Sequence, residues 1–288
     1  MAALLQLERV NRAFPGVQAL RDISFAVEAG GLHALIGENG AGKSTLIKIL
    51  SGALAADSGR LLLDGQLYQP RNPRHALRCG LATIYQELNL LPTRSVLANL
   101  TLGQEPARYG IIDRQRAKLA ARQVLQQLQA EYVPLEAPLH ELTLGQRQLV
   151  AIGKALLSKC RLLIMDEPTA ALNSAEVDAL FSMLAALKAR GVTVLYVSHR
   201  VDEIFRIADA VTVLRDGQHV RTTPLSATTP DALIADMLGR PLISAFPPRH
   251  QCLDKVVLSV ERLSKVRAFE DVSFELHAGE VLAITGLA

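Results

Sequence analysis

Hydrophobic and polar residues follow one another along the chain in runs that predict strands and helices in alternation. Three short, mostly apolar runs, at residues 32–36, 162–165 and 193–197, are typical of strands covered on both faces. Helical spacing of apolar residues fills much of the chain between them, up to about residue 239. This pattern predicts an α/β fold with a largely parallel sheet and helices on both of its faces.

Two helices can be bounded from their caps and their apolar spacing. One is predicted to begin at Asn173, where Glu176 completes a capping box, and to end before Gly191. Another is predicted to begin near Asp113, inside an insertion at 86–144 that carries little strand signal. The residues that we expect this second helix to bury are Ala117, Ala121, Val124, Leu125 and Leu128.

Polar residues follow each of the three predicted central strands. They are residues 37–45 after the first strand, Asp166 and Glu167 after the second, and Ser198 and His199 after the third. Ligands of open α/β sheets bind at the carboxyl ends of the strands. We therefore expect these three segments to meet in one crevice.

The chain contains an internal repeat. Residues 271–286 align without gaps on residues 22–37, an offset of 249, and are identical at seven positions. Ser24 aligns with Ser273. Four residues before them, Leu20 aligns with Phe269, and no match is expected upstream of this pair. The alternative is that the two segments are unrelated strand-turn-strand units. It is less favoured, because the positions that differ between the two copies still keep the same apolar pattern.

The repeat changes how the length is interpreted. At about 150 residues per domain, 288 residues predict two domains, but the offset leaves only 39 residues for the second copy. The proline-rich stretch from 240 to 254 has no clear period and predicts a linker. We expect a complete first domain at 1–240, a linker at 241–255 and the first strands of a second domain at 256–288, as in a protein truncated to about half its length.

The segment after the first strand fits the phosphate-binding pattern G-x-x-x-x-G-K-[ST], between a predicted strand and a predicted helix. Its glycines let backbone N–H groups surround phosphate oxygens, while Lys43 reaches the β- and γ-phosphates and Ser44 coordinates Mg²⁺. A glycine-rich turn alone would explain the glycines but not the Lys-Ser pair. The segment comprises Gly37, Glu38, Asn39, Gly40, Ala41, Gly42, Lys43, Ser44 and Thr45.

The other strand ends supply candidate catalytic residues. Asp166 is predicted to hold Mg²⁺, and Glu167 to act as general base on the attacking water. A solvated carboxylate pair is the alternative for these two residues taken alone. His199 is expected beside the γ-phosphate, although a lone histidine is more often structural. Gln86 is a candidate to touch Mg²⁺ or the water while it links two lobes.

In this order and spacing, the phosphate-binding segment, Gln86, residues 142–146, Asp166-Glu167 and His199 resemble the nucleotide-binding subunit of an ABC transporter. Within that family, the chain is most similar to the double-cassette ATPases of simple-sugar importers, such as those for ribose, galactosides or xylose. The resemblance implies an α/β P-loop NTPase fold with a RecA-like core, an antiparallel β subdomain and an inserted helical subdomain. It also implies ATP and Mg²⁺ as cofactors, so the domains at 1–240 and 256–288 would be a first ABC cassette and a fragment of a second.

The resemblance implies further roles. Phe14 matches the aromatic residue that stacks on adenine, although an early aromatic is more often a packing residue. Residues 87–92 match the surface that receives a short helix of the membrane subunit. The signature segment is expected to act in trans, on ATP held by an opposing cassette, and its residues are Leu142, Thr143, Leu144, Gly145 and Gln146.

The signature departs from the usual pattern at two positions. Thr143 replaces Ser and keeps the hydroxyl group, whereas Leu144 replaces Gly. Asn173 also stands where many cassettes have Asp. The departures at Leu144 and Asn173 therefore fall at positions that, by the resemblance, communicate between the two cassettes of a dimer. An ordinary capping box from Thr143 to Gln146 is the structural alternative, and it is compatible with a role in trans.

The resemblance also implies the partners. They are the membrane permease subunits of an ABC importer, a periplasmic or extracellular sugar-binding protein that acts indirectly, and a second ABC cassette. We expect an ATPase bound peripherally at the cytoplasmic face of the membrane, with no signal peptide and no transmembrane segment. The three cysteines, Cys79, Cys160 and Cys252, exclude a fully paired disulfide framework and fit a reducing cytoplasm.

The net charge and the motifs argue against two other functions that the phosphate-binding segment would allow. The alternative is a soluble tandem-cassette ATPase that acts on ribosomes or nucleic acid without a permease. The net charge of only +3 and the lack of a basic linker argue against a nucleic-acid partner. The signature segment argues against a P-loop kinase or GTPase.

Overall fold

The computed structural model describes residues 3–108, 111–240, 254–266 and 268–285. The chain divides into two compact units, Met1–Pro241 and Leu242–Ala288, and each is described by itself. Most of the expected linker, at 241–253, and Cys252 and Gly286 lie outside the described residues. The assignment of a first cassette, a linker and a second cassette to these ranges stays a prediction.

The first unit is built on one ten-stranded sheet with the strand order β5-β4-β1-β2-β12-β11-β3-β10-β9-β6. The three central strands predicted from the sequence are confirmed and lie side by side, with β10 between the other two. Neighbouring strands from β11 to β6 are parallel. The parallel strands are β3 (Leu32–Ile36), β6 (Leu81–Ile84), β9 (Leu162–Asp166), β10 (Thr193–Ser198) and β11 (Ala210–Arg215).

The other half of the sheet is mainly antiparallel. Its strands are β1 (Ala3–Phe14), β2 (Val17–Glu28), β4 (Ser58–Leu63), β5 (Gln66–Leu67) and β12 (Gln218–Pro224). Within this half, β12 pairs with β2 in parallel at Gln218 and Arg21, and β12 joins the parallel half through its antiparallel pairing with β11. The sheet therefore combines a parallel core with an antiparallel β subdomain, as the family resemblance implies.

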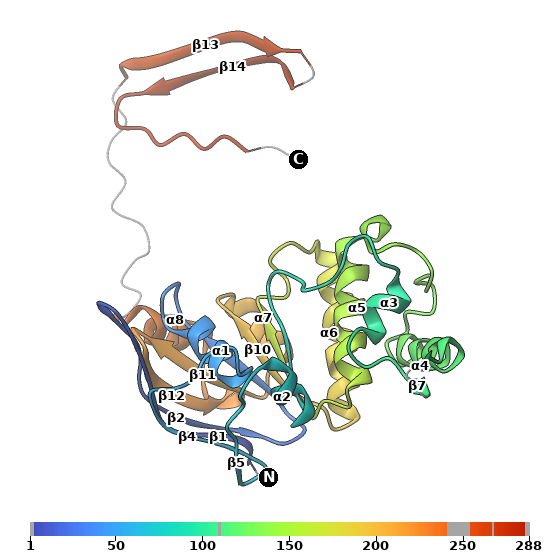
Figure 1. Cartoon of the computed structure of the whole chain (residues 1–288). Helices are drawn as coiled ribbons and strands as arrows, with labels where there is room; N and C mark the ends of the chain where they lie inside the picture. Colours follow the sequence, from blue (N-terminus) through green and yellow to red (C-terminus); the bar gives the residue numbers. More distant parts are fainter. Residues whose placement is uncertain (1–2, 109–110, 241–253, 267, 286–288) are drawn as a thin grey trace. The chain divides into compact units, whose positions relative to one another are not determined.

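Helices cover the sheet and form a separate lobe of the first unit (Figure 1). They are α1 (Lys43–Leu50), α2 (Pro73–Arg78), α3 (Val96–Thr101), α4 (Arg114–Gln127), α5 (Leu144–Leu157), α6 (Ser174–Ala189), α7 (Val201–Ile207) and α8 (Pro230–Leu238). Figure 1 places α3, α4 and α5 together, beyond α6 as seen from the sheet. The short strands β7 (Ala107–Arg108) and β8 (Ile111–Ile112) also belong to the inserted segment. This lobe is the helical subdomain expected between residues 86 and 144, extended by α5.

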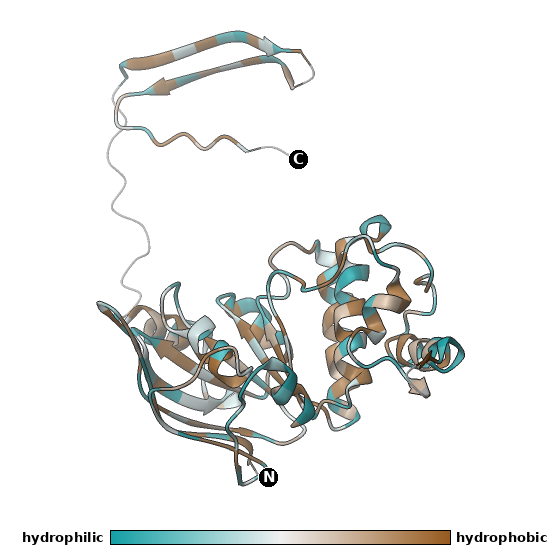
Figure 2. Cartoon of the chain, in the orientation of Figure 1, coloured by the Kyte–Doolittle hydropathy of each residue, from teal (hydrophilic) through white to brown (hydrophobic). Residues whose placement is uncertain are grey.

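The two helices bounded from the sequence are confirmed. Asn173 caps α6 and Glu176 completes its capping box. Asp113 caps α4, whose Ala117, Ala121, Val124 and Leu125 are buried, as is Leu128 at its end. In Figure 2, α4 accordingly has one hydrophobic and one hydrophilic side, while the central strands are mostly hydrophobic.

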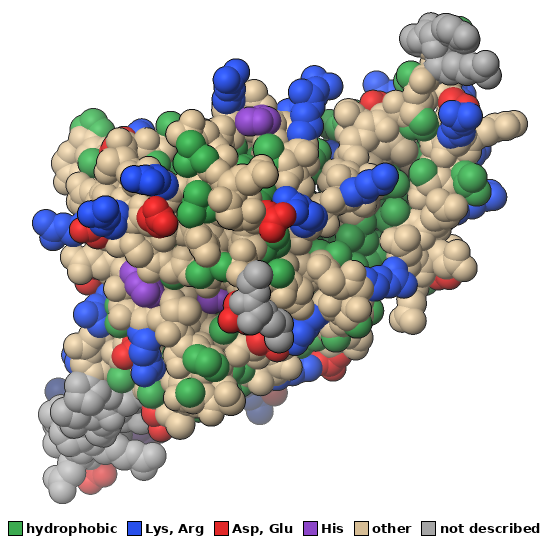
Figure 3. Space-filling view, turned by 90° about the horizontal axis from the view of Figure 1, so that it is seen from below, with side chains coloured by type: hydrophobic (Ala, Val, Ile, Leu, Met, Phe, Trp, Pro, Cys, Tyr) green, Lys and Arg blue, Asp and Glu red, His purple; other side chains and the backbone are tan. Residues whose placement is uncertain are grey.

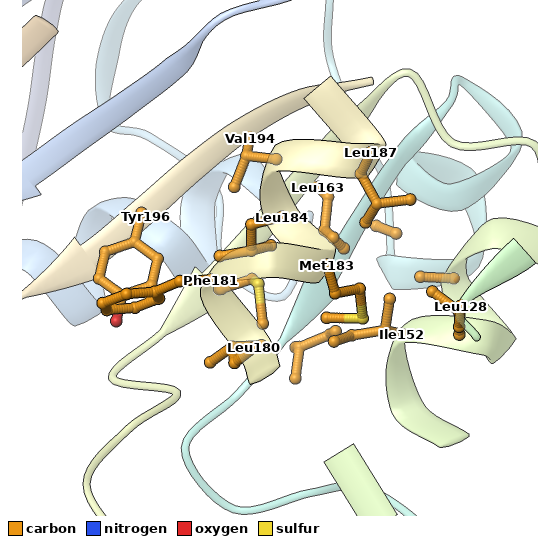
Figure 4. Packing of buried hydrophobic residues seen from close by; sticks show 14 of the residues in the cluster. Leu128, Ile152, Leu163, Leu180, Phe181, Met183, Leu184, Leu187, Val194 and Tyr196 are labelled. Atoms are coloured by element: carbon orange, nitrogen blue, oxygen red, sulfur yellow. The ribbon is translucent and has the colours of Figure 1, made fainter. Parts of the chain in front are cut away.

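Alternate residues of the parallel strands face two different hydrophobic clusters. One cluster contains Leu35 of β3 and Ile164 of β9 together with apolar residues of α1. The other lies under α6 and continues into the helical lobe. Figure 4 shows that side chains of α6 pack on the strand residues Leu163, Val194 and Tyr196, while Ile152 and Leu128 of the helical lobe lie on the far side. Helix α6 thus joins the sheet to the lobe through continuous apolar packing.

The second unit contains an antiparallel hairpin, β13 (Val256–Lys265) and β14 (Phe269–His277), that repeats the pairing of β1 and β2. Leu7 pairs with Phe25, and Val260 pairs with Phe274 in the same way. Likewise, the N–H of Arg9 donates to Ser24 Oγ at 2.8 Å, and that of Arg262 to Ser273 Oγ at 2.8 Å.

This register corrects the expectation that the repeat stops at Phe269. The match continues upstream at an offset of 253, so that Glu8-Arg9 corresponds to Glu261-Arg262. The offset differs from the downstream value of 249 because the second hairpin has four fewer residues at its tip. Arg12 pairs with Leu20 where Lys265 pairs with Phe269, and the tip that carries Phe14 has no counterpart. An alignment without gaps could not reveal the first strand of the repeat.

A chain of polar side chains crosses the sheet of the first unit from the buried His33. His33 Nε2 lies 2.7 Å from Thr212 Oγ1, which lies 2.8 Å from Thr222 Oγ1. Thr222 in turn contacts His219 Nε2 at 2.8 Å. Burial, and secondarily the charge of His219, lower the pKa of His33 from 6.5 to about 4. The folded protein therefore holds His33 neutral.

His33 is expected to make the fold less stable in mild acid. Below its ordinary pKa of 6.5 the unfolded chain takes up a proton that the folded chain refuses until about pH 4, so the free energy of unfolding falls as the pH falls through this window. Denaturant unfolding should show a loss of about 2 kcal/mol between pH 7 and pH 5 that His33→Gln removes. The exposed His140→Gln is the control; an unchanged pH dependence in His33→Gln would contradict the assignment.

Candidate functional site

The register of the parallel strands brings the candidate residues to one edge of the sheet. Ser198, the last residue of β10, pairs with Ile36, the last residue of β3. On the other side of β10, Val197 pairs with Asp166, which ends β9. The segments that follow these three strands therefore begin at the same edge of the sheet.

Two glycines allow the phosphate-binding segment to fold tightly between β3 and α1. A Cβ atom on Gly37 would lie 2.4 Å from the carbonyl oxygen of Leu214, and one on Gly42 would lie 2.7 Å from that of Ala19. Gly42 also has a φ of 99°, which residues with a side chain rarely adopt. The loop thus leads directly into α1, whose first N–H groups point into it.

Lys43 is buried inside this loop, with 6% of its surface exposed. Its Nζ donates hydrogen bonds to the carbonyl oxygens of Gly37, at 2.7 Å, and Glu38, at 3.0 Å. Burial lowers the pKa of Lys43, while Glu167 and Asp166 act in the opposite direction. An ammonium group has three N–H donors, so one donor remains without an acceptor among the described residues. The loop therefore fits an anionic phosphate group next to Lys43.

The acidic pair lies at the end of β9. Burial, and then the charge of Glu167, raise the pKa of Asp166, against the opposing effect of Lys43 and Lys48. Glu167 adopts a φ of 47°, an unusual conformation for a residue with a side chain, and its N–H donates to Val197 O at 2.9 Å. This backbone conformation turns the chain away from the strand immediately after Asp166.

Glu167 and His199, which the sequence connected only through their strand ends, are in direct contact. His199 Nδ1 lies 2.9 Å from Glu167 Oε1. The Glu167 side chain is 18% exposed and that of His199 is 50% exposed. The two candidate catalytic residues thus form a pair that is open on the histidine side.

The candidate Mg²⁺ ligands are Ser44, Gln86 and Asp166. Ser44 is exposed at the start of α1, and Gln86 is exposed two residues after the end of β6. Within the described parts of the chain, no three residues among His, Cys, Asp and Glu are grouped to hold a metal by themselves. One carboxylate with neutral oxygen donors is a set that suits Mg²⁺ when phosphates complete the coordination, and the raised pKa of Asp166 indicates a carboxylate that a cation would stabilise.

Phe14 lies at the tip of the β1–β2 hairpin and is 40% exposed. The Arg12 guanidinium lies over its ring, 5.0 Å from the centroid. Asp57 holds this arrangement, because it accepts hydrogen bonds from Arg12 Nη1 at 2.6 Å and from the N–H of Ala13 at 2.7 Å. The ring is therefore fixed by a cation on one face, which sequence reasoning did not anticipate.

The signature segment lies in the helical lobe. Thr143 caps α5: its Oγ1 accepts from Gln146 N at 3.2 Å, and Gln146 Oε1 accepts from Thr143 N at 3.0 Å. The capping box expected as the structural alternative is therefore present. In Figure 1, α5 lies in the helical lobe beyond α6, whereas α1 lies against the sheet. The described residues include no hydrogen bond or ion pair between this segment and residues 37–45.

Sequence reasoning missed two buried polar residues that hold the turn after Glu167. Gln148 of α5, four residues after the signature's Leu144, donates from Nε2 to the carbonyl oxygen of Pro168 at 2.9 Å. Glu203 of α7 accepts a hydrogen bond from Thr169 at 2.9 Å. Neither residue belongs to a segment that the motif pattern covers. A polar residue on the apolar face of each helix was the only available signal.

Comparison with known proteins identifies the family. The profile described as ABC transporter matches residues 20–170, just over half of the chain. The chain belongs to the ABC transporter family. The family resemblance inferred from the motifs is thereby confirmed.

Curated members of the ABC transporter family resemble nearly the whole chain. The Ribose import ATP-binding protein RbsA of Chromobacterium violaceum is 45% identical over 96% of this chain and 55% of its own length. The Arabinose import ATP-binding protein AraG of Chromohalobacter salexigens is 43% identical over 99% of this chain and 58% of its own length. The chain thus spans about half the length of the curated relatives it matches.

Solved structures confirm the ABC ATPase fold. A nucleotide-free ATP-binding cassette from an ABC transporter aligns with a TM-score of 0.73 at 27% identity, over 83% of this chain and 96% of that one. The cassette MJ1267 in its ADP conformation aligns with a TM-score of 0.71 at 26% identity, over the same shares of the two chains.

Gln148→Leu tests the link between α5 and the turn after Glu167. The substitution leaves the buried carbonyl oxygen of Pro168 without its donor, so the free energy of unfolding should fall by about 1–3 kcal/mol. Gln123→Leu, at an exposed position of α4, is the matched control and should change stability by less than about 0.5 kcal/mol in denaturant unfolding. Equal effects in the two variants would mean that the bond to Pro168 contributes nothing.

Proposed function

We propose that this chain is the ATP-hydrolysing part of an ABC importer, which couples ATP binding and hydrolysis to uptake of a monosaccharide through separate membrane subunits. The observation that carries this proposal is the contact between Glu167 and His199 at the sheet edge where Lys43 is buried. The names of the relatives, which are import proteins for ribose and arabinose, support the transport role.

ATP would bind with its phosphates in the loop from Gly37 to Thr45. Lys43 donates its remaining N–H to the β- or γ-phosphate, and the N–H groups at the start of α1 donate to the other oxygens. Ser44, Asp166 and Gln86 would hold Mg²⁺, which neutralises the charge on the phosphates. Phe14, fixed by Arg12, would stack on the adenine.

Glu167 would act as general base. Its Oε1 is engaged by His199, which orients the carboxylate, while Oε2 makes no hydrogen bond to any described residue. Oε2 is therefore the atom that would accept the proton of the attacking water. His199 is half exposed, and its other ring nitrogen would face the γ-phosphate. With Nδ1–H bonded to Glu167, that nitrogen donates to a phosphate oxygen only when the imidazole is protonated.

The signature segment would complete the site of a second cassette. Thr143 uses its hydroxyl oxygen as an acceptor for the cap of α5. A hydroxyl group is also a donor, so its hydrogen remains for the γ-phosphate of ATP held by the opposing cassette. The capping role and the role in trans are therefore compatible, and the second cassette is a required partner.

A cavity of about 360 Å³ supports a permease partner. It is lined by apolar residues of β6, α2 and α5 and by Leu88 and Leu90, which fall in the segment at 87–92 expected to receive a helix of the membrane subunit. Among the described residues, no helix is both long and apolar enough to cross a bilayer. We propose that the subunit acts at the cytoplasmic face of the membrane and that a sugar-binding protein acts on the permease from outside.

The alternative function, on ribosomes or nucleic acid, has less support. In Figure 3, Lys and Arg side chains are spread over the visible face with Asp and Glu side chains among them, and they form no continuous stripe there. A basic stripe is the usual footprint of a nucleic-acid partner.

Glu167→Gln is expected to keep ATP binding and to lose turnover. The amide cannot accept the proton, so the rate should fall by at least about 100-fold while the affinity for ATP changes little. The exposed Glu28→Gln is the control. Rates should be compared over a range of protein concentrations, because the site is completed by a second cassette. Normal turnover in Glu167→Gln would contradict the assignment of Glu167 as general base.

The transport role predicts that the full-length protein binds its permease. Full-length protein should co-purify with permease subunits, and its ATPase rate should rise when the permease and the sugar-loaded binding protein are present in proteoliposomes. Proteoliposomes without permease are the control. Sedimentation with ribosomes and no response to the permease would replace the importer by the alternative function.

A further inference from the structure

A buried carboxylate joins the two turns that carry Glu167 and His199. Glu203, in the first turn of α7, is 1% exposed. Its Oε2 accepts hydrogen bonds from Thr169 Oγ1 at 2.9 Å and from the hydroxyl group of Tyr196 at 2.8 Å. Ser198 Oγ donates to the same oxygen at 3.4 Å. Three hydroxyl groups from two separate segments therefore meet on one carboxylate oxygen.

The other oxygen of Glu203 faces a cation. Oε1 lies 2.8 Å from Arg200 Nη1 in an ion pair. The burial of Tyr196, and secondarily the charge of Glu203, raise the pKa of Tyr196, so its hydroxyl group stays protonated and donates. The carboxylate is thus compensated for its lost hydration by three hydroxyl donors and one guanidinium group.

The partners of Glu203 lie next to the candidate catalytic residues in the chain. Thr169 follows Glu167 by two residues, and Ser198 immediately precedes His199. The Glu167 side chain meets His199 at 2.9 Å although its backbone has a φ of 47°. A residue in such a conformation keeps it only when the surrounding structure holds it there. The bond from Thr169 to Glu203 is one of the contacts that hold this turn.

Stability alone does not account for a carboxylate at this position. A buried ion pair is weak evidence for stability, because an apolar residue of similar volume often serves as well or better. What an apolar residue could not supply is a directional link between the turn after β9 and the end of β10. That link spans the two turns that carry Glu167 and His199.

We propose that Glu203 is a positioning residue for ATP hydrolysis, which holds Glu167 against His199 through the hydroxyl group of Thr169. This inference rests on the proposed function, in which Glu167 is the general base. Glu203 is buried and acts only through Thr169 and its neighbours. Loss of the link should therefore lower kcat and leave the KM for ATP unchanged, because no contact of the phosphate-binding loop is altered.

Two substitutions that each remove one hydroxyl group from the same carboxylate test the proposal. Thr169→Val should lower kcat about tenfold or more, with the KM for ATP within about twofold of wild type. Thr169→Ser, which keeps the hydroxyl group, should restore kcat. Tyr196→Phe leaves the bonds of Thr169 and Ser198 to Glu203, so the link between the two turns persists. It should lower the melting temperature but keep kcat within about twofold. If Thr169→Val does not fold, Thr169→Ala gives the same comparison without added volume.

The proposal is overturned if Thr169→Val and Tyr196→Phe change kcat by the same factor, or if the Thr169 variants that lack the hydroxyl group keep the wild-type kcat. A fall in kcat that Thr169→Ser fails to reverse would also overturn it. Failure of the proposed function has a different signature. In that case the wild-type chain shows no ATPase activity, or Glu167→Gln turns over normally, whatever the Thr169 variants do.

Discussion

The candidate site depends on the positive charge of Lys43, which is buried at the sheet edge where β3, β10 and β9 end. Taking an ammonium group out of water is costly, and two backbone carbonyl groups of its own loop and the carboxylates of Asp166 and Glu167 offset that cost. The acidic side is compensated only in part, because burial and the charge of Glu167 raise the pKa of Asp166 against the opposing effect of Lys43 and Lys48. The edge of the sheet therefore suits an anion next to the lysine and a cation next to the aspartate, which is the charge distribution of a nucleotide phosphate with its metal ion.

A second constraint acts on the turn that follows Glu167. This turn is held from two directions, at Pro168 by Gln148 of the helical lobe and at Thr169 by Glu203 of α7. Both side chains are buried, so their hydrogen bonds do not compete with water and either is costly to lose. Gln148 lies on the helix that begins with the signature segment, so its bond to Pro168 links that helix directly to the turn after Glu167. The general-base candidate of one site is thus connected within its own cassette to the segment that would serve the opposing site.

Features with a local cause could be predicted from the sequence, and those that arise from tertiary pairing could not. The caps of α4 and α6, their buried stripes and the phosphate-binding loop are each specified by residues within one or two helical turns, and the structure has them as predicted. The contact between Glu167 and His199 followed in outline, because parallel strands end at a common edge. Strand β6, with only four residues, gave too short a signal to be recognised, and Gln148 and Glu203 have no motif at all. Their partners become neighbours only once β9, β10 and the helical lobe have packed together.

The two hairpins show how far the same local pattern determines burial. Leu5 and Val10 of β1 are fully buried, whereas their counterparts Leu258 and Leu263 of β13 are 47% and 50% exposed. The cross-strand register is the same in both hairpins, so backbone pairing does not depend on the cover that buries the first one. Burial does depend on it: in the first unit the apolar face of the hairpin packs on residues of β3, β4 and α1, at about 25 cal/mol for each Å² removed from water. The second hairpin has the same apolar face, but it lacks the tip that carries Phe14. A nucleotide site built on it would therefore have no residue at the position of Phe14.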